Sequence, residues 1–159
     1  MANARSEKML HDKSSVWYRL RKQRCLVFCN GFFEHRDIGA KNKLPYFIKP
    51  ANADLFCFAG LYNYSPLPDM ETGEIKGTFA ILTREANKLM AQIHNSGENS
   101  GRMPVILSET EANRWIMPAL SEAEIDSILS HEYPSALLQA WPVNRIRTPK
   151  EDNENVITP

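Results

Sequence analysis

The stretch Leu55-Phe-Cys-Phe-Ala-Gly-Leu-Tyr-Asn-Tyr64 decides the fold of this chain, because it is almost continuously apolar. Such a run, rich in aromatic side chains and bounded by turn residues, is typical of a strand in the middle of a sheet. We therefore expect a central strand over Leu55–Tyr64, preceded by a strand over Leu44–Lys49 and followed by one over Thr78–Thr83. Residues 65–77 contain two prolines and the pair Thr72-Gly73, which predict a surface hairpin loop.

Further strands are expected outside this group. Arg24–Arg36 is rich in Cys, Leu, Val and Phe and predicts one strand, in which Gly31 marks a bulge or a close backbone approach. Pro104–Leu107 and Leu137–Val143 are short apolar runs that predict two more strands.

Capping residues and helical spacing predict the helices. A short helix is expected over Val16–Leu20 after a serine cap, and a helix over Glu85–Ile93 would place His94 at its C-terminal end. Two more helices should begin at capping boxes, Ser108-x-x-Glu111 and Ser121-x-x-Glu124. Together these elements predict an α+β fold, mostly antiparallel, with a curled sheet or barrel and peripheral helices.

Composition is that of a globular chain. With 159 residues, 43% of them hydrophobic and 24% charged, we expect a single domain over 1–159 whose last part, 144–159, is an irregular polar tail. No run approaches the ~18 apolar residues of a membrane span, so we expect no membrane partner and a cytoplasmic location. The three cysteines lie among apolar residues and are expected to be reduced.

The zero net charge conceals an asymmetry. Residues 1–50 hold eleven Lys or Arg and four Asp or Glu, a net charge of +7, whereas residues 51–159 carry −7. Two solvated faces of opposite sign would explain this balance. A nucleic-acid partner is favoured because basic residues surround one candidate site segment: Arg5, Arg19, Arg21, Lys22 and Arg24. Binding should then weaken steeply with salt.

Three stretches place polar or titratable side chains beside apolar runs. They are Asn3-Ala-Arg5, Gly31-Phe-Phe-Glu34, and Ile93-His94 followed by Arg102-Met-Pro-Val-Ile-Leu107. A carboxyl group and an imidazole brought together in a pocket are the usual groups for proton transfer. Metal binding is poorly supported, because Cys25-x3-Cys29 lies in a strand-like segment and no second Cys/His pair has finger spacing; we expect neither a metal nor a cofactor.

In order along the chain, these stretches and their neighbours resemble the SRAP family, the SOS response-associated peptidases that process abasic DNA. The resemblance covers nearly the whole chain. The matching stretches are Asn3-Ala-Arg5-Ser-Glu7, Arg24-Cys25-Leu26-Val27, Gly31-Phe32-Phe33-Glu34, Pro45-Tyr46-Phe47-Ile48, Phe58-Ala59-Gly60-Leu61, Thr83-Arg84-Glu85-Ala86-Asn87, Ile93-His94, Arg102-Met-Pro-Val-Ile-Leu107, Trp115, Pro142-Val143-Asn144 and Val156-Ile157-Thr158-Pro159.

Two departures from the family pattern stand out. The family's N-terminal segment begins with a cysteine directly after the initiator methionine, whereas here Met1-Ala2 leads straight into the Asn-Ala-Arg stretch, so we expect a domain truncated at its N-terminus. The second departure is an insertion over residues 95–101, between His94 and Arg102. It is expected to change how these two side chains are presented.

The resemblance implies a reaction on the aldehyde of an abasic site, in single-stranded or junction DNA, by a monomeric protein of the DNA damage response. The family's terminal cysteine offers an amine that forms a Schiff base and a thiol that closes a thiazolidine ring, which gives a stable DNA–protein crosslink. The same terminus must first be exposed by removal of a leader, the peptidase activity of the family's name. The implied lyase activity is cleavage of the DNA strand by β-elimination from the imine between the amine and the abasic aldehyde.

By the same resemblance, Glu34 is the general acid/base, His94 assists ring opening and Asn3 orients the amine. Arg5 and Arg102 hold the flanking phosphates, and Thr83 adds a hydroxyl group. Structural alternatives remain open for five of these residues: Glu34, His94, Asn3, Arg5 and Arg102. Glu34 would pair with Arg24 or Arg36, and His94 would be the C-cap of a helix or a hydrogen-bonded residue of the core. Asn3 would lie in an N-terminal loop, and the two arginines would be ordinary surface residues. The aromatic side chains of Trp17, Phe32 and Phe33 would pack in the core rather than stack on a base.

A non-catalytic single-stranded DNA-binding remnant of the family is the alternative function, and an upstream start codon is a third reading. Both follow from the missing terminal cysteine. An α-amine at Met1-Ala2 has no adjacent thiol, so the 159-residue polypeptide should give no thiazolidine crosslink. Lys8 or Lys13 would give only a transient imine with slow β-elimination.

Overall fold

The structure is a computed structural model that describes residues 2–144 and 157–158, in two compact units. The first unit combines the chain up to Phe28 with Cys57–Arg84 and Pro104–Glu132. The second combines Cys29–Phe56, Glu85–Met103 and the chain from Tyr133 onward. Most of the predicted irregular tail over 144–159 lies outside the described residues.

The first unit is built on a sheet whose strand order is β1-β6-β5-β2. Its strands are β1 (Ala2–Arg5), β2 (Arg24–Cys29), β5 (Phe56–Tyr64), β6 (Gly77–Glu85) and β8 (Ile106–Leu107), which pairs with β5. Strand β5 lies between β6 and β2, which confirms the predicted central strand. Its pairing with β6 and with β8 is antiparallel, and β1 pairs with β6 in parallel.

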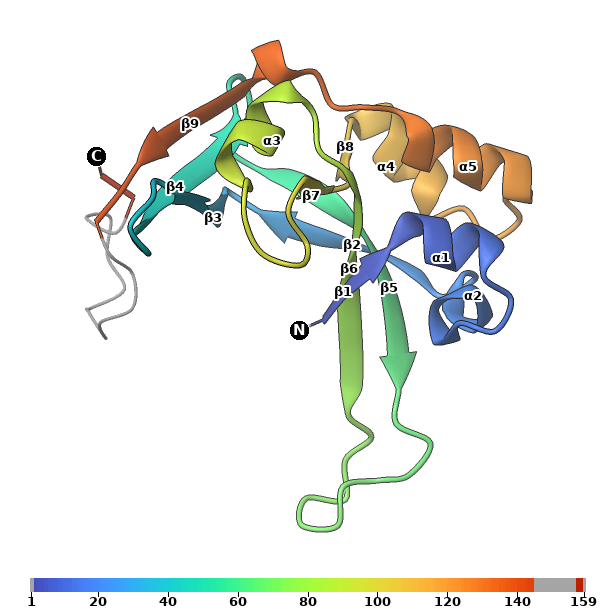
Figure 1. Cartoon of the computed structure of the whole chain (residues 1–159). Coiled ribbons are helices and arrows are strands. Elements are labelled where there is room, and N and C mark those ends of the chain that lie inside the picture. The colour runs from blue at the N-terminus through green and yellow to red at the C-terminus, as the bar shows by residue number, and fades with distance from the viewer. Residues whose placement is uncertain (1, 145–156, 159) are drawn as a thin grey trace. The chain divides into compact units, whose positions relative to one another are not determined.

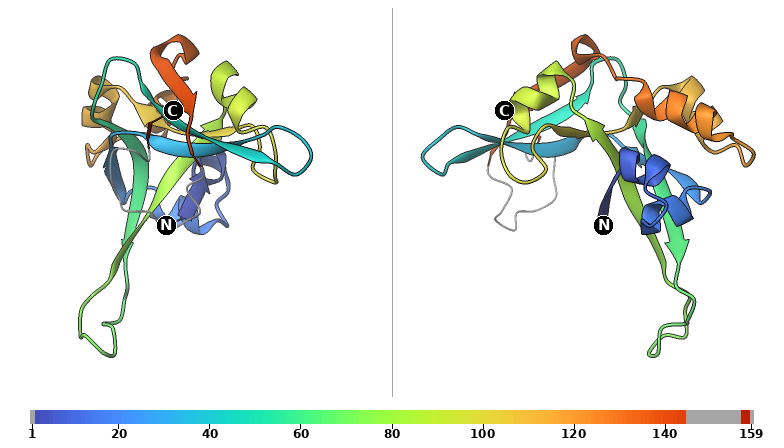
Figure 2. Two further views of the ribbon diagram at one scale, coloured as in Figure 1. Left: turned by 90° about the vertical axis from the view of Figure 1, so that its left-hand side faces the viewer. Right: turned by 45° about the vertical axis from the view of Figure 1, so that its right-hand side comes forward.

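Strands β5 and β6 form a long hairpin that extends beyond the helices of this unit (Figure 1). Tyr62 is paired with Phe79 and Tyr64 with Gly77, so the connection falls over residues 65–76, close to the predicted loop. Both views in Figure 2 show this hairpin projecting with its loop at the tip.

Four helices belong to the first unit: α1 (Ser6–His11), α2 (Val16–Leu20), α4 (Glu109–Trp115) and α5 (Glu122–Ser130). The side chain of Ser15 accepts a hydrogen bond from the Trp17 amide, which confirms the predicted cap of α2. Both predicted capping boxes, at the starts of α4 and α5, are formed. Each cap satisfies amides that the first turn of a helix otherwise leaves without partners.

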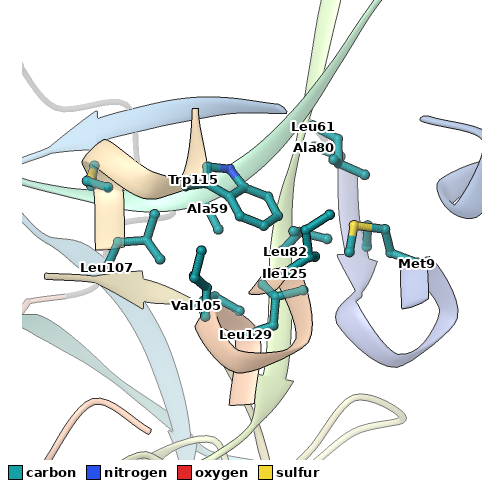
Figure 3. Close-up of a cluster of buried hydrophobic side chains, with 14 residues drawn as sticks. Met9, Ala59, Leu61, Ala80, Leu82, Val105, Leu107, Trp115, Ile125 and Leu129 are labelled. Atoms are coloured by element: carbon teal, nitrogen blue, oxygen red, sulfur yellow. The ribbon is translucent and has the colours of Figure 1, made fainter. Parts of the chain in front are cut away.

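Trp115 at the end of α4 is the centre of the first unit's core (Figure 3). The side chain is fully buried, and its Nε1 donates to the carbonyl groups of Cys25 and Gly60, 3.1 and 3.3 Å away. Arg24 donates in return to the Trp115 carbonyl from Nε, at 2.8 Å. Helix α4 is therefore fixed to strands β2 and β5 by polar contacts as well as by apolar packing.

The second unit contains an antiparallel sheet of order β3-β4-β9. Its strands are β3 (Phe32–Asp37), β4 (Lys43–Pro50) and β9 (Leu138–Pro142), accompanied by α3 (Lys88–Ile93) and the short 3-10 helix η1 (Ser135–Leu137). Strand β7 (Arg102–Pro104) begins in this unit, and its last residue, Pro104, belongs to the first unit. The Phe47 ring on β4 lies 5.2 Å from the rings of both Phe33 and Trp141, which joins the three strands.

The α+β class, mostly antiparallel with peripheral helices, is confirmed, but several boundaries differ from the predictions. Arg24–Arg36 is not one strand: β2 and β3 belong to different sheets and are separated at Asn30-Gly31. The predicted strand Pro104–Leu107 is divided between β7 and β8. Strand β1 and helix α1 were not predicted at all. In the described part of the chain, no helix is long and apolar enough to cross a membrane.

Gly31 lies where the strand breaks, and a steric constraint requires glycine at this position. A β-carbon at this position would come within 2.0 Å of Cζ of Phe47 and within 2.8 Å of two further ring atoms. Phe47 is buried and holds the aromatic contacts of the second unit. The predicted close backbone approach at Gly31 is thus confirmed, with the ring of Phe47 as the neighbour.

We expect Gly31→Ala to destabilise the protein by about 1–3 kcal/mol, because the Phe47 ring must leave its place between Phe33 and Trp141. The measurement is urea denaturation of the wild type, Gly31→Ala, Phe47→Leu and the double variant. Because the clash involves these two side chains, the double variant should lose less than the sum of the singles. Additive losses, or a Gly31→Ala variant as stable as the wild type, would contradict this explanation.

Candidate active site

The structure brings Glu34 and His94 together in the second unit. Glu34 lies on β3, and its Oε2 is 3.6 Å from Nδ1 of His94, which directly follows α3. Both side chains are mostly sheltered, with 26% and 19% of their surface exposed. A carboxylate and an imidazole at this separation can exchange a proton after a small approach.

The hydrogen bonds of each group determine which atoms are available for chemistry. Oε1 of Glu34 accepts from the His35 amide at 2.8 Å, so Oε2 is the oxygen directed at the histidine. Nδ1 of His94 lies 2.9 Å from the Arg102 carbonyl oxygen. Because a carbonyl can only accept, Nδ1 carries a hydrogen, and Nε2 of the neutral ring is left with the lone pair.

Helix α3 delivers His94 to this position. Its N-cap is Asn87, whose Oδ1 accepts from the Met90 amide at 2.9 Å while Nδ2 donates to the Tyr133 carbonyl at 2.7 Å. The predicted start of this helix at Glu85 is wrong, because the cap makes the helix begin at Lys88. At the other end, the His94 amide donates to the Met90 carbonyl at 2.8 Å. His94 is therefore the C-cap of α3, in agreement with the structural alternative that places it at the end of a helix.

The structural alternative for Glu34 is not observed. The Arg24 guanidinium donates instead to three carbonyl groups of the first unit, those of Arg21, Trp115 and Met117, and burial lowers its pKa. Arg36 lies two residues farther along β3 and is exposed. The ion-pair partner of Glu34 is His94.

Asn3, Arg5 and Thr83 lie in the first unit. Strand β1 pairs with β6 so that Asn3 is opposite Ile81 and Arg5 opposite Thr83. Ala4 between them is fully buried in the core, so Asn3 and Arg5, both exposed, share the other face of the sheet. Thr83 is buried, and its Oγ1 donates to the Ala4 carbonyl at 3.4 Å. Asn3 is therefore on a strand and not in the loop of the structural alternative.

The aromatic residues considered for base stacking have structural partners or partial burial. Trp17 packs against the core of the first unit, and the Phe33 ring contacts Phe47. Phe32 is half-buried at the start of β3. Packing is therefore the observed role of Trp17 and Phe33.

Cys25, Cys29 and Cys57 are not joined by disulfide bonds. Burial raises the pKa of Cys25 and of Cys57, because the thiolate loses its hydration. A raised pKa makes both thiols poor nucleophiles near neutral pH. Among the residues that the structure describes, no group of three or more His, Cys, Asp or Glu side chains is arranged to hold a metal ion.

Sequence reasoning missed one polar residue beside this site, Asn95. Its side chain hydrogen-bonds to the backbone of Asp37 at the end of β3. The two residues are far apart in sequence, and Asn95 opens the segment that was interpreted as an insertion. The only local signal was an amide residue directly after His94.

Comparisons with known proteins show what this chain is similar to. Residues 1–146 match the sequence model of the family described as SOS response associated peptidase (SRAP). The abasic site processing proteins YoqW and YobE of Bacillus subtilis are 32% and 31% identical, over 99% and 92% of this chain and 66% and 62% of their own lengths. A crystal structure of a Bacteroides thetaiotaomicron protein matches with a TM-score of 0.84 and 33% identity, over 98% of this chain and 64% of that protein. The chain thus spans about two thirds of the length of these relatives. It belongs to the SRAP family.

Proposed function

We propose that this chain processes abasic sites in DNA, with Glu34 and His94 as its proton-transfer pair. The observation that carries the proposal is the 3.6 Å separation of Glu34 Oε2 and His94 Nδ1 in a mostly sheltered position. The names of the curated relatives, abasic site processing proteins, supply the substrate class. The pair itself supplies the general acid and base that such a reaction needs.

The chemistry of the lesion explains why two proton-transfer groups are useful. The sugar of an abasic site is a closed hemiacetal in equilibrium with an open aldehyde. Opening the ring requires a proton to leave the 1-hydroxyl group and a proton to reach the ring oxygen. A carboxylate can remove the first and an imidazolium can supply the second, and the same two groups then serve the loss of water when an amine attacks the aldehyde.

The fixed orientation of His94 supports this division. Because Nδ1 is directed at the Arg102 carbonyl, the opposite nitrogen, Nε2, is the one that exchanges a proton with substrate. Oε1 of Glu34 accepts a hydrogen bond from the His35 amide, which fixes the orientation of the carboxylate. Oε2 is then the oxygen that removes a proton from the substrate. Neither group needs a change of secondary structure to take part.

Phosphate recognition is proposed for Arg5 and Arg102, and roles in positioning the substrate for Asn3 and Thr83. Arg5 and Asn3 are exposed on one face of β1, where a DNA strand has access to them. The +7 net charge of residues 1–50 supports an electrostatic contribution to this binding. Single-stranded or junction DNA is the proposed substrate, because an unpaired abasic sugar is accessible without opening a duplex.

Covalent crosslinking, autopeptidase activity and a place in the SOS response are proposals taken from the family resemblance. The crosslink requires an amine and a thiol on adjacent carbons at a chain terminus. Lys8 and Lys13 are proposed as amines that form a reversible imine with the aldehyde. The alternative function is non-catalytic binding of single-stranded DNA, to which the basic residues 1–50 would contribute in the same way.

The experiment is borohydride trapping of the purified chain on single-stranded DNA that contains one abasic site. Wild type should give a trapped covalent band, and Glu34→Gln should slow its formation by roughly a hundredfold, the usual effect of removing a general acid/base. His94→Ala should slow it by a similar factor. DNA affinity, measured by fluorescence anisotropy, should be nearly unchanged in both variants and should fall steeply with salt.

Arg36→Gln is the matched control, since Arg36 is on the same strand as Glu34 and is exposed. It should trap at the wild-type rate, and DNA with an intact base should not be trapped at all. Wild-type rates in folded Glu34→Gln and His94→Ala would refute their proposed roles. Salt-sensitive binding with no trapping by any variant would favour the non-catalytic alternative.

A further inference from the structure

The segment after His94 is a closed turn. The Gly101 amide donates to the His94 carbonyl at 2.8 Å, so the insertion over 95–101 returns to its starting point before Arg102. Gly97 and Gly101 have φ angles of +92° and +69°, which glycine adopts without steric cost. The Ala86 amide donates to the Gly101 carbonyl at 2.8 Å and holds the end of the turn. His94 and Arg102 are therefore neighbours despite the inserted residues.

The side chain of Asn95 joins this turn to the strand that carries Glu34. Oδ1 accepts from the Asp37 amide at 2.8 Å, and Nδ2 donates to the Asp37 carbonyl at 3.0 Å. The side-chain amide of Asn95 thus makes the same two hydrogen bonds with the end of β3 that the backbone of a neighbouring strand would make. Only one orientation of the amide satisfies both bonds, because the reverse would oppose donor to donor and acceptor to acceptor.

This double hydrogen bond lies directly beside the candidate catalytic pair. Asn95 is one peptide unit from His94, and Asp37 is on the same strand as Glu34, three residues farther along. The Glu34–His94 separation of 3.6 Å is longer than a hydrogen bond, so a displacement of a few tenths of an ångström decides whether the groups engage. The bond from His94 Nδ1 to the Arg102 carbonyl orients the ring but does not connect it to β3.

We propose that Asn95 is a positioning residue that sets the distance between His94 and Glu34. Its amide fixes the turn to β3, and loss of that connection lets His94 move away from the carboxylate. The catalytic consequence rests on the proposed function, whereas the positioning itself does not require DNA. Asn95 touches no reacting group and acts only through His94.

The direct test uses NMR of the imidazole signals of His94 in the full chain without DNA. In the wild-type background, Glu34→Gln should shift these signals, because the carboxylate lies next to Nδ1. In the Asn95→Ala background, the same substitution should shift them at least about twofold less. Asn95→Asp keeps the acceptor for the Asp37 amide but places a charged oxygen against the Asp37 carbonyl, so it should behave like Asn95→Ala.

Glu98→Ala is the matched control, because Glu98 is an exposed residue of the same turn. It should leave the response of His94 to Glu34→Gln at the wild-type size. Equal responses in the wild-type, Asn95→Ala and Asn95→Asp backgrounds, with native-like spectra, would overturn the proposal. Asn95 is exposed, so these variants are expected to fold.

A kinetic measurement connects the positioning to the reaction. Asn95→Ala should slow borohydride trapping on abasic DNA by about tenfold, with DNA affinity nearly unchanged, because only the proton-transfer geometry is altered. An unchanged trapping rate alongside a reduced NMR response would overturn the catalytic part and leave the positioning intact. Absence of trapping in the wild type would count against the proposed function, and the NMR experiment would still decide the role of Asn95.

Discussion

The hydrogen bond between His94 Nδ1 and the Arg102 carbonyl is the interaction on which the candidate site depends. At 2.9 Å it settles which ring nitrogen carries the hydrogen and which keeps its lone pair. It also orients the ring so that Oε2 of Glu34 approaches the protonated nitrogen. Without it, the imidazole would rotate about its side-chain bonds, and proximity to a carboxylate would carry little chemical meaning.

The surrounding scaffold makes this bond possible. Asn87 fixes the beginning of α3 with two hydrogen bonds, and the buried side chains of Met90 and Ile93 hold its inner face. The other member of the pair, Glu34, directly follows Phe33 on β3, and the ring of Phe33 packs against Phe47. The titratable groups thus belong to elements that are fixed by packing and capping.

Some features of this structure follow directly from local sequence. The continuous apolar run of β5 and the capping boxes at Ser108 and Ser121 act within a few residues, so their outcome was predictable. Helix α1 carries no comparable signal, because its N-cap is Arg5 and no side chain caps it. Strand β1 has only four residues, too few to establish a pattern of alternation.

Other features depend on residues that are distant in sequence. Gly31, between β2 and β3, is in close contact with the ring of Phe47 on β4. Glu34 and His94 were both identified as candidates, but their separation depends on how α3 packs and on Asn95, whose side chain bonds to the backbone of Asp37. Local patterns identify such residues by type, whereas tertiary contacts decide which of them meet.

The central claim is that Glu34 and His94 act as one unit, and a double-mutant cycle tests it most directly. The rates of imine trapping on abasic single-stranded DNA would be compared for the wild type, Glu34→Gln, His94→Ala and the double variant. If the two groups function as a pair, the double variant should be about as slow as the slower single variant, because removing either partner already disables the other. Rate losses that multiply, with all four proteins folded and binding DNA equally, would show that the two residues act independently and would contradict the account.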